Sequence, residues 1–197
     1  MIRAAVFISG RGSNLAKIIQ QCQAGTLREC CRLVGVVSNR PEAGGVEIAK
    51  NAGLPVIVFP AEKEQTREKY DKALLKKISE WKPEIIILAG FDRILSKVMV
   101  KAFPNKILNI HPADPKLFRG LNGYKWAFEN RLESTRVTVH LVDEGVDTGP
   151  VLATAVVSLT GAASLEEVEA RGLAVEHRLY PKAVRQFVLQ LMAGRNH

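Results

Sequence analysis

Apolar runs and amphipathic segments alternate along the chain up to residue 111. Runs rich in β-branched residues predict strands that are buried on both faces, as in a parallel sheet. Apolar residues at helical spacing, as at Tyr70, Leu74 and Ile78, predict amphipathic helices between these strands. Pro83 ends the helical pattern that begins at Tyr70, and the last residue of this pattern is Trp81, because the residue before a proline avoids the helical conformation. The predicted strands are 4–9, 33–37, 55–59, 84–88 and 106–111, and the predicted helices are 15–22, 44–52, 70–81 and 96–102.

The pattern changes after residue 111. A loop over 112–123 is rich in proline and glycine, and a helix follows to about residue 131. Two further strands are predicted at 136–142 and 151–159 with little between them, so we expect antiparallel or mixed pairing there. Residues 164–192 are predicted to be helical, and Pro181 either kinks this helix or starts a second one.

Strands that alternate with helices in this way predict an α/β fold. Such units form a mostly parallel, doubly wound sheet with right-handed crossovers and helices on both faces. No repeat, low-complexity segment or linker interrupts the pattern. We therefore interpret residues 1–197 as a single domain.

The composition is that of a globular protein. Hydrophobic residues make up 47% of the 197 residues and charged residues 24%, which excludes a disordered or collagen-like chain. No apolar stretch reaches the roughly 18 residues that span a bilayer, and the first residues fit a strand better than a signal peptide. Cys22, Cys30 and Cys31 cannot all pair with one another, so we expect reduced thiols and a cytoplasmic protein.

The net charge of +8 predicts a surface that attracts anions, without saying which ones. Residues 62–82 mix both signs, as a solvated helix face does. Arg178, Lys182 and Arg185 lie on one face of the last predicted helix. Since no aromatic residues accompany these charges, we expect no nucleic-acid partner.

A glycine-rich turn at residues 10–14 joins the first strand to the first helix. Glycines let the backbone approach a ligand closely, and the free N–H groups and dipole of a helix N-terminus favour an anion. Ser13 and Asn14 are residue types that cap helices. The turn matches neither the dinucleotide fingerprint nor the nucleoside-triphosphate loop. It predicts either a phosphate-monoester site or an ordinary capped turn.

The end of the fifth strand carries the candidate chemistry. Asn109 and His111 lie on the same side of this strand, at the edge where open α/β sheets bind ligands. An amide beside an imidazole can stabilise an oxyanion while the imidazole transfers protons. Asp143, Glu144 and Asp147 lie in the turn between the last two strands, where a carboxylate would favour protonated His111.

Taken singly, each of these residues also fits a turn or a packed core. His140 and His177 are interpreted as packed histidines with no chemical role. No cluster has the spacing of metal ligands, so we expect no metal.

Four motifs occur in an order known from one enzyme family. They are Ser-Gly-Arg-Gly-Ser-Asn-Leu at 9–15, Leu-Ala-Gly-Phe-Asp-Arg-Ile-Leu at 88–95, Asn-Ile-His-Pro at 109–112 and Asp-Thr-Gly-Pro at 147–150. With them, nearly the whole chain resembles the phosphoribosylglycinamide formyltransferases, which have the formyltransferase fold. This resemblance implies transfer of the formyl group of 10-formyltetrahydrofolate to the amine of glycinamide ribonucleotide, in purine biosynthesis. It also implies a seven-stranded mixed sheet, with a Rossmann-like, nucleotide-binding part over about 1–100 and a folate and catalytic part over about 101–197.

The resemblance assigns roles residue by residue. Asn109 and protonated His111 stabilise the oxyanion of the tetrahedral intermediate, and Asp147 keeps His111 protonated. The substrate positions are Gly12, Ser13, Asn14 and Glu176, with Arg171 beside Glu176, and the folate positions are Arg67, Asp92, Arg93, Ile94, Leu95 and Asn109.

Three features depart from the family pattern. Ala-Asp-Pro-Lys at 113–116 replaces Ser-Leu-Leu-Pro, Asp92 occupies a position that is commonly apolar, and Leu173 replaces a polar substrate contact.

Other functions stay open at this point. A formyltransferase could act on methionyl-tRNA or on an amino-sugar nucleotide, although the tRNA enzyme generally has a C-terminal extension for which 197 residues leave no room. A phosphate- or nucleic-acid-binding module without catalysis is the alternative of another class. We expect small-molecule substrates, no membrane partner, and either a monomer or a homodimer.

Overall fold

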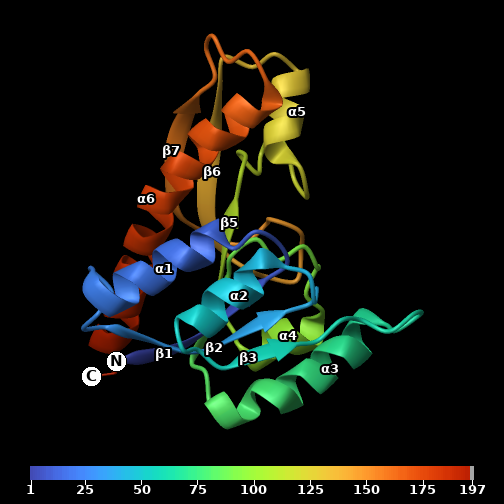
Figure 1. The fold of residues 1–197 in the computed structure, drawn as a ribbon, viewed down its shortest axis with the longest axis vertical. Coiled ribbons are helices and arrows are strands. Elements are labelled where there is room, and N and C mark those ends of the chain that lie inside the picture. The colour runs from blue at the N-terminus through green and yellow to red at the C-terminus, as the bar shows by residue number, and fades with distance from the viewer. Residues whose placement is uncertain (196–197) are drawn as a thin grey trace.

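The computed structural model describes residues 1–195 and contains one seven-stranded sheet with helices on both faces (Figure 1). The strands are β1 (Ile2–Ile8), β2 (Cys31–Ser38), β3 (Val56–Val58), β4 (Ile85–Leu88), β5 (Ile107–His111), β6 (Ser134–Leu141) and β7 (Val151–Ser158). The helices are α1 (Ser13–Ala24), α2 (Gly44–Asn51), α3 (Arg67–Ile78), α4 (Lys97–Ala102), α5 (Gly123–Glu129) and α6 (Leu165–Ala193), with a 3₁₀ turn at Ser79–Trp81.

The strand order is β3-β2-β1-β4-β5-β6-β7. Neighbours from β3 to β5 pair in parallel, whereas β6 pairs antiparallel to both β5 and β7. The expected mostly parallel α/β sheet with a mixed end is therefore confirmed. The division near residue 100 into two parts stays a prediction.

Strand β1, third in the sheet order, shows why a continuous apolar run at residues 4–8 is needed. Its alternate side chains enter two separate cores, because successive residues of a strand point to opposite faces. Val6 and Ile8 pack with residues of α1, α2 and α6 on one face. Ala5 and Phe7 pack with residues of α3 and α4 on the other face. A strand buried on both faces has no position for a polar side chain.

α6 is one helix that includes Pro181. The alternative of a second helix starting at this proline is wrong, and packing supplies the reason. Pro181 is buried together with Tyr180, and the Tyr180 hydroxyl donates to the carbonyls of Leu88 and Leu108 at 2.9 and 3.0 Å. These contacts offset the backbone hydrogen bond that proline removes. Within residues 1–195, no helix is long and apolar enough to cross a membrane.

The parallel strands all end at one edge of the sheet. The order reverses between β1 and β4, which makes this the switch point where open α/β sheets bind ligands. The turn after β1 (residues 10–14), the segment after β4 (residues 90–95) and the loop after β5 (residues 112–122) meet at this edge.

Candidate active site

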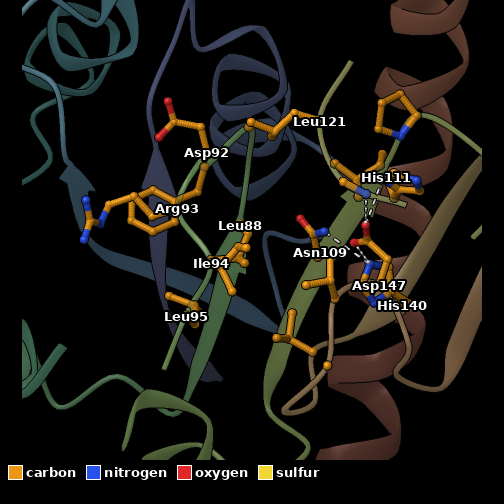
Figure 2. Close-up of a pocket in the computed structure, with 18 of the residues that line it drawn as sticks. Leu88, Asp92, Arg93, Ile94, Leu95, Asn109, His111, Leu121, His140 and Asp147 are labelled. Carbon is orange, nitrogen blue, oxygen red and sulfur yellow. Dashed lines mark hydrogen bonds and ion pairs between the residues drawn. The ribbon is translucent and has the colours of Figure 1, made fainter. Parts of the chain in front are cut away.

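A cavity of about 450 Å³ opens at the carboxyl edge of the sheet, between the ends of β4 and β5 and the loop from β6 to β7. Four polar side chains converge in it: Asn109, His111, His140 and Asp147 (Figure 2). Much of the remaining lining is apolar and consists of Leu88, Phe91, Ile94, Leu95, Leu121, Val142 and Val146. Such an apolar hollow with a few convergent polar groups is typical of a small-molecule site.

His111, at the end of β5, lies between two hydrogen-bond acceptors. Its Nε2 is 2.9 Å from the carbonyl oxygen of Phe118, and its Nδ1 is 3.5 Å from Oδ2 of Asp147. The backbone N–H of Gly120 donates to the same carboxylate oxygen at 2.8 Å. A carbonyl and a carboxylate only accept, so the doubly protonated imidazolium is the form of His111 that satisfies both neighbours.

His140 completes the cluster from the neighbouring strand. Its Nδ1 lies 2.9 Å from the carbonyl oxygen of Leu141, so we assign a proton to that nitrogen. Its Nε2 lies 3.2 Å from Nδ2 of Asn109 and 3.3 Å from Oδ1 of Asp147. In the neutral ring Nε2 accepts from the Asn109 amide, and in the protonated ring it donates to Asp147.

The interpretation of His140 as a packed histidine without a chemical role overlooked these contacts. Its side chain is buried, as that interpretation implied, but it faces Asn109 and Asp147 in the cavity. The available signal was the antiparallel pairing of the last strands. In that pairing His140 lies directly opposite Asn109, and cross-strand neighbours have adjacent side chains.

Asp147 is the carboxylate that the loop from β6 to β7 directs toward the histidines. Burial alone would raise the pKa of Asp147, but hydrogen bonds from His140 and the Gly120 backbone, and the charges of the two histidines, together hold that pKa below its usual range. Asp143 instead organises the loop, because it accepts from the Thr148 hydroxyl at 2.6 Å. Asp147 itself adopts a left-handed backbone conformation with φ of 52°.

The segment 90–95 lines the cavity, but its two charged side chains point elsewhere (Figure 2). The Arg93 guanidinium lies over the ring of Tyr70, 4.1 Å from its centre. Asp92 accepts from the side-chain amide of Asn39 at 2.8 Å and pairs with the Arg40 guanidinium. The polar side chains of this segment therefore hold the segment in place, and its contribution to the cavity surface is largely apolar and backbone.

The other predicted folate positions differ in their exposure and in whether they line the cavity. Ile94 is half exposed at the cavity, whereas Leu95 is nearly buried beneath it. Arg67 is the first residue of α3, is exposed, and does not line the cavity. Arg67 therefore lies outside the cavity lining, one turn of α3 before Tyr70, on whose ring Arg93 lies.

The turn after β1 is shaped by Gly12. This residue has φ of 82°, and a Cβ there would lie only 2.5 Å from the Cα of Gly45. Gly12 occupies the N-cap position of α1 without any side-chain capping bond. Ser13 and Asn14, although of residue types that cap helices, do not cap α1, because both lie inside its first turn. Their backbone N–H groups have no acceptor within the helix and are available to an anion.

Asn14 instead joins a buried network. Its Nδ2 donates to one carboxylate oxygen of Glu176 at 2.5 Å, and the Tyr124 hydroxyl donates to the other oxygen at 2.6 Å. All three residues are more than nine-tenths buried. Among the described residues, Oδ1 of Asn14 has no hydrogen-bond partner. The structure thus brings together two predicted substrate residues, Asn14 and Glu176, and adds Tyr124, which the sequence analysis did not identify.

Two further residues of α6, Gly172 and Arg171, lie close to this network in the chain. Gly172 makes room for Tyr124, since a Cβ at Gly172 would lie 2.1 Å from Cζ of its ring. Arg171 donates to the carbonyls of Ser158 and Thr160 at 3.2 and 2.9 Å and pairs with Glu167. The guanidinium of Arg171 therefore links α6 to the end of β7, and among the described residues it forms no hydrogen bond or ion pair with Glu176.

The chain matches known formyltransferases over most of its length. A family model described as Formyl transferase matches residues 2–184. Phosphoribosylglycinamide formyltransferase of Escherichia coli (strain K12) is 36% identical over 182 residues, which cover 92% of this chain and 85% of that protein. The protein of the same name from Bacillus subtilis (strain 168) is 30% identical over 188 residues, 95% of either chain.

Solved structures agree with the sequence comparisons. Glycinamide ribonucleotide transformylase 1 from Symbiobacterium toebii superposes with a TM-score of 0.91 at 37% identity, covering 96% of this chain and 89% of that one. Phosphoribosylglycinamide formyltransferase from Brucella melitensis gives a TM-score of 0.86 at 38% identity, covering 95% of each chain.

Proposed function

This chain belongs to the formyl transferase family, and we propose that it transfers the formyl group of 10-formyltetrahydrofolate to the amine of glycinamide ribonucleotide. The observation that carries the proposal is the cluster of an amide, two imidazoles and a carboxylate at the polar end of an apolar cavity. Acyl transfer needs a hydrogen-bond donor for a developing oxyanion and a group that moves protons, and this cluster supplies both.

The cavity fits the proposed formyl donor. A reduced pterin is a flat heterocycle that needs apolar contact on its faces and hydrogen bonds at its edge. The exposed apolar side chains Ile94, Leu121 and Val146 border the cavity, and the backbone of segment 90–95 lines it. These groups would hold the ring system, with the formyl group directed toward Asn109 and His111.

In the proposed reaction, the substrate amine attacks the formyl carbon and the bond from that carbon to N10 of the folate breaks. Asn109 and the His111 imidazolium donate to the oxygen of the tetrahedral intermediate. The amine loses a proton and N10 gains one, so formylated substrate and tetrahydrofolate leave. His111 Nε2 donates to the Phe118 carbonyl in this structure, so we propose that the substrate oxygen takes the place of that carbonyl.

Asp147 has two roles in this proposed reaction. It accepts from His111 and His140, which favours the protonated rings over the neutral ones. It also binds the N–H of Gly120 and so fixes the end of the loop 112–122 that covers His111. A carboxylate whose pKa is held low remains charged throughout the neutral range, as both roles require.

The acceptor is proposed to bind at the turn 10–14 and Glu176. The free N–H groups at the start of α1 suit its phosphate, with Gly12, Ser13 and Asn14 around it. The carboxylate of Glu176 keeps further lone pairs that can accept from ribose hydroxyls. Arg67 and Arg171 remain proposed ligand contacts, each requiring a side-chain movement from its place in this structure.

The direct test incubates the purified chain with 10-formyltetrahydrofolate and glycinamide ribonucleotide and follows the folate product by its absorbance. Formyl transfer is confirmed by the mass of the acceptor, which gains the mass of CO. Methionyl-tRNA and an amino-sugar nucleotide serve as competing acceptors. Turnover with either of these, and none with glycinamide ribonucleotide, would refute the proposed substrate.

A further inference from the structure

Three side chains that follow three different strands form a closed network of hydrogen bonds. The Ser9 hydroxyl donates to Oδ1 of Asn39 at 2.5 Å. Nδ2 of Asn39 donates to Oδ1 of Asp92 at 2.8 Å. The backbone N–H of Asp92 donates back to the Ser9 oxygen at 2.9 Å. We name these contacts the Ser9–Asn39–Asp92 network.

The network spans the switch point of the sheet. Ser9 follows β1, Asn39 follows β2, and Asp92 lies in the segment that follows β4. β1 lies between β2 and β4 in the sheet, and a backbone bond of 3.0 Å from Ser9 to the carbonyl of Gly90 adds a fourth link. Ser9 directly precedes the turn 10–14, whereas Asp92 is part of the segment 90–95 that lines the cavity.

Arg40 reinforces the network from its solvent side. Its guanidinium pairs with Oδ2 of Asp92, the carboxylate oxygen that Asn39 does not use. Burial alone would raise the pKa of Asp92, but the hydrogen bonds from Asn39 and Arg40 together with the Arg40 charge lower it. Asp92 is therefore charged at neutral pH, and an apolar side chain at this position could make none of its side-chain contacts.

We propose that Asp92 is a positioning residue that sets the distance between the acceptor turn 10–14 and the cavity segment 90–95. The inference rests on the proposed function, in which these two segments hold the two reactants. A reaction between two bound molecules depends steeply on their relative placement, so a small displacement lowers the rate even when both still bind. Among the described residues, neither Asp92 nor Arg40 forms a hydrogen bond or ion pair with the catalytic cluster, so we expect their effect on the rate to pass through the position of the segment.

The test replaces Asp92 by leucine, which removes all side-chain contacts but retains the N–H bond to Ser9. The matched control is Glu129→Ala, which deletes the exposed carboxylate of the Lys125–Glu129 pair on α5. With both substrates saturating, we expect Asp92→Leu to lower kcat about tenfold or more, while each dissociation constant, measured alone by calorimetry, changes less than about threefold. Asp92→Asn, which retains an acceptor for Asn39, should fall between Asp92→Leu and the unsubstituted chain.

Hydrogen–deuterium exchange provides a readout that does not require turnover. In Asp92→Leu, amide exchange should accelerate both in segment 90–95 and in turn 10–14, and in Glu129→Ala in neither. Unchanged exchange in turn 10–14, or a weaker donor affinity with unchanged kcat, would overturn the proposal and reduce Asp92 to a local pocket residue. Failure of the proposed function is separate, because it would appear as absent formyl transfer in the unsubstituted chain.

Discussion

Two carboxylates are buried at the carboxyl edge of this sheet, and they have opposite surroundings. Asp147 faces two imidazoles, those of His111 and His140, and an imidazole can take up or release a proton. Glu176 faces the Tyr124 hydroxyl and the Asn14 amide, which are neutral hydrogen-bond donors.

The backbones that carry the two carboxylates differ as well. Asp147 lies in a loop and adopts a positive φ, whereas Glu176 lies within the long helix α6. Loops supported by a rigid scaffold often carry catalytic groups, and a helix holds a side chain in a fixed place. From this comparison we propose that Asp147 takes part in proton movement, whereas Glu176 provides a constant shape for binding. Substitutions should therefore affect kcat on the Asp147 side and KM on the Glu176 side.

The largest effect is expected in the Asp147 cluster. Removal of one oxyanion donor typically lowers kcat about 10²- to 10³-fold, so Asn109→Ala should lose that much and His111→Ala at least as much. Asp147→Asn should lower kcat heavily and shift the pH–rate profile, because asparagine cannot favour the imidazolium. The effect of combining it with His111→Ala should be far from additive, since Asp147 acts through His111. Near-normal kcat with an unchanged pH profile in Asp147→Asn would remove Asp147 from the mechanism.

On the acceptor side, Gly12→Ala should raise the KM for the ribonucleotide by roughly tenfold to a hundredfold. The new Cβ would collide with the Gly45 backbone and displace the turn. Gly53→Ala is the matched control, because Gly53 also has a positive φ of 70° but has open space around it. Steady-state kinetics should show normal affinity for the folate in both variants. A lost folate affinity with unchanged ribonucleotide KM would reverse the assignment of the two sides.

Tyr124→Phe should raise the acceptor KM about tenfold with little change in kcat, because one hydrogen bond to the Glu176 carboxyl group is lost. The matched control is Tyr70→Phe, which removes an equally short bond of 2.6 Å to the carbonyl of Phe59. If both variants behave alike in the kinetic assay, the Tyr124 hydroxyl contributes only to stability.

The depressed pKa of Asp147 predicts a pH-dependent stability. A carboxyl with a lower pKa in the folded state stabilises that state above its unfolded pKa, near the ordinary value of 3.8, and this contribution disappears as the pH falls through the folded pKa. Asp147→Asn retains a residue that tolerates positive φ. The difference in unfolding free energy between the unsubstituted chain and this variant should be constant near neutrality and shrink below about pH 4. Urea titrations at a series of pH values measure it, and a difference that grows on acidification would contradict the assignment.

The smallest effect on catalysis is expected from the cysteines. Hydrogen bonding with the Cys22 thiol and burial raise the pKa of Cys31, and burial raises that of Cys30. All three thiols lie away from the cavity, and acyl transfer to an amine needs no thiolate. Replacing all three by serine should keep kcat within about twofold at some loss of thermal stability. Complete loss of activity in a folded variant would revive a covalent mechanism.

The fold could be predicted from the sequence because each element carries its own signal. The stretches 4–8 of β1, 33–37 of β2 and 85–88 of β4 are apolar throughout, as burial on both faces of a sheet requires. At Pro181 the sequence left open whether a second helix starts there, because the packing of Tyr180 against β4 and β5 was not visible in the local pattern.

Strand and helix periods alone could predict contacts only between neighbours in sequence, and the pairing of Asp147 with His111 came from the turn between the last two strands and from the family resemblance. Asn109 and His111 share one face of one strand, so their proximity followed from the strand period. His140 required the register of β6 against β5, and Tyr124 required a contact with Glu176, which is 52 residues away. The direction of the Asp92 and Arg93 side chains depends on Arg40 and Tyr70, which other elements supply.

The space that Gly172 leaves for the Tyr124 ring also constrains how this sequence can diverge. A glycine inside a helix costs about 1 kcal/mol relative to alanine, so drift toward alanine would by itself be favoured. Yet the first added carbon would occupy the place of the Tyr124 ring. Positions 124 and 172 are therefore expected to covary among descendants of this chain. A lineage that fills the gap must first, or at the same time, reduce or redirect the aromatic residue, and its Glu176 must then find another donor.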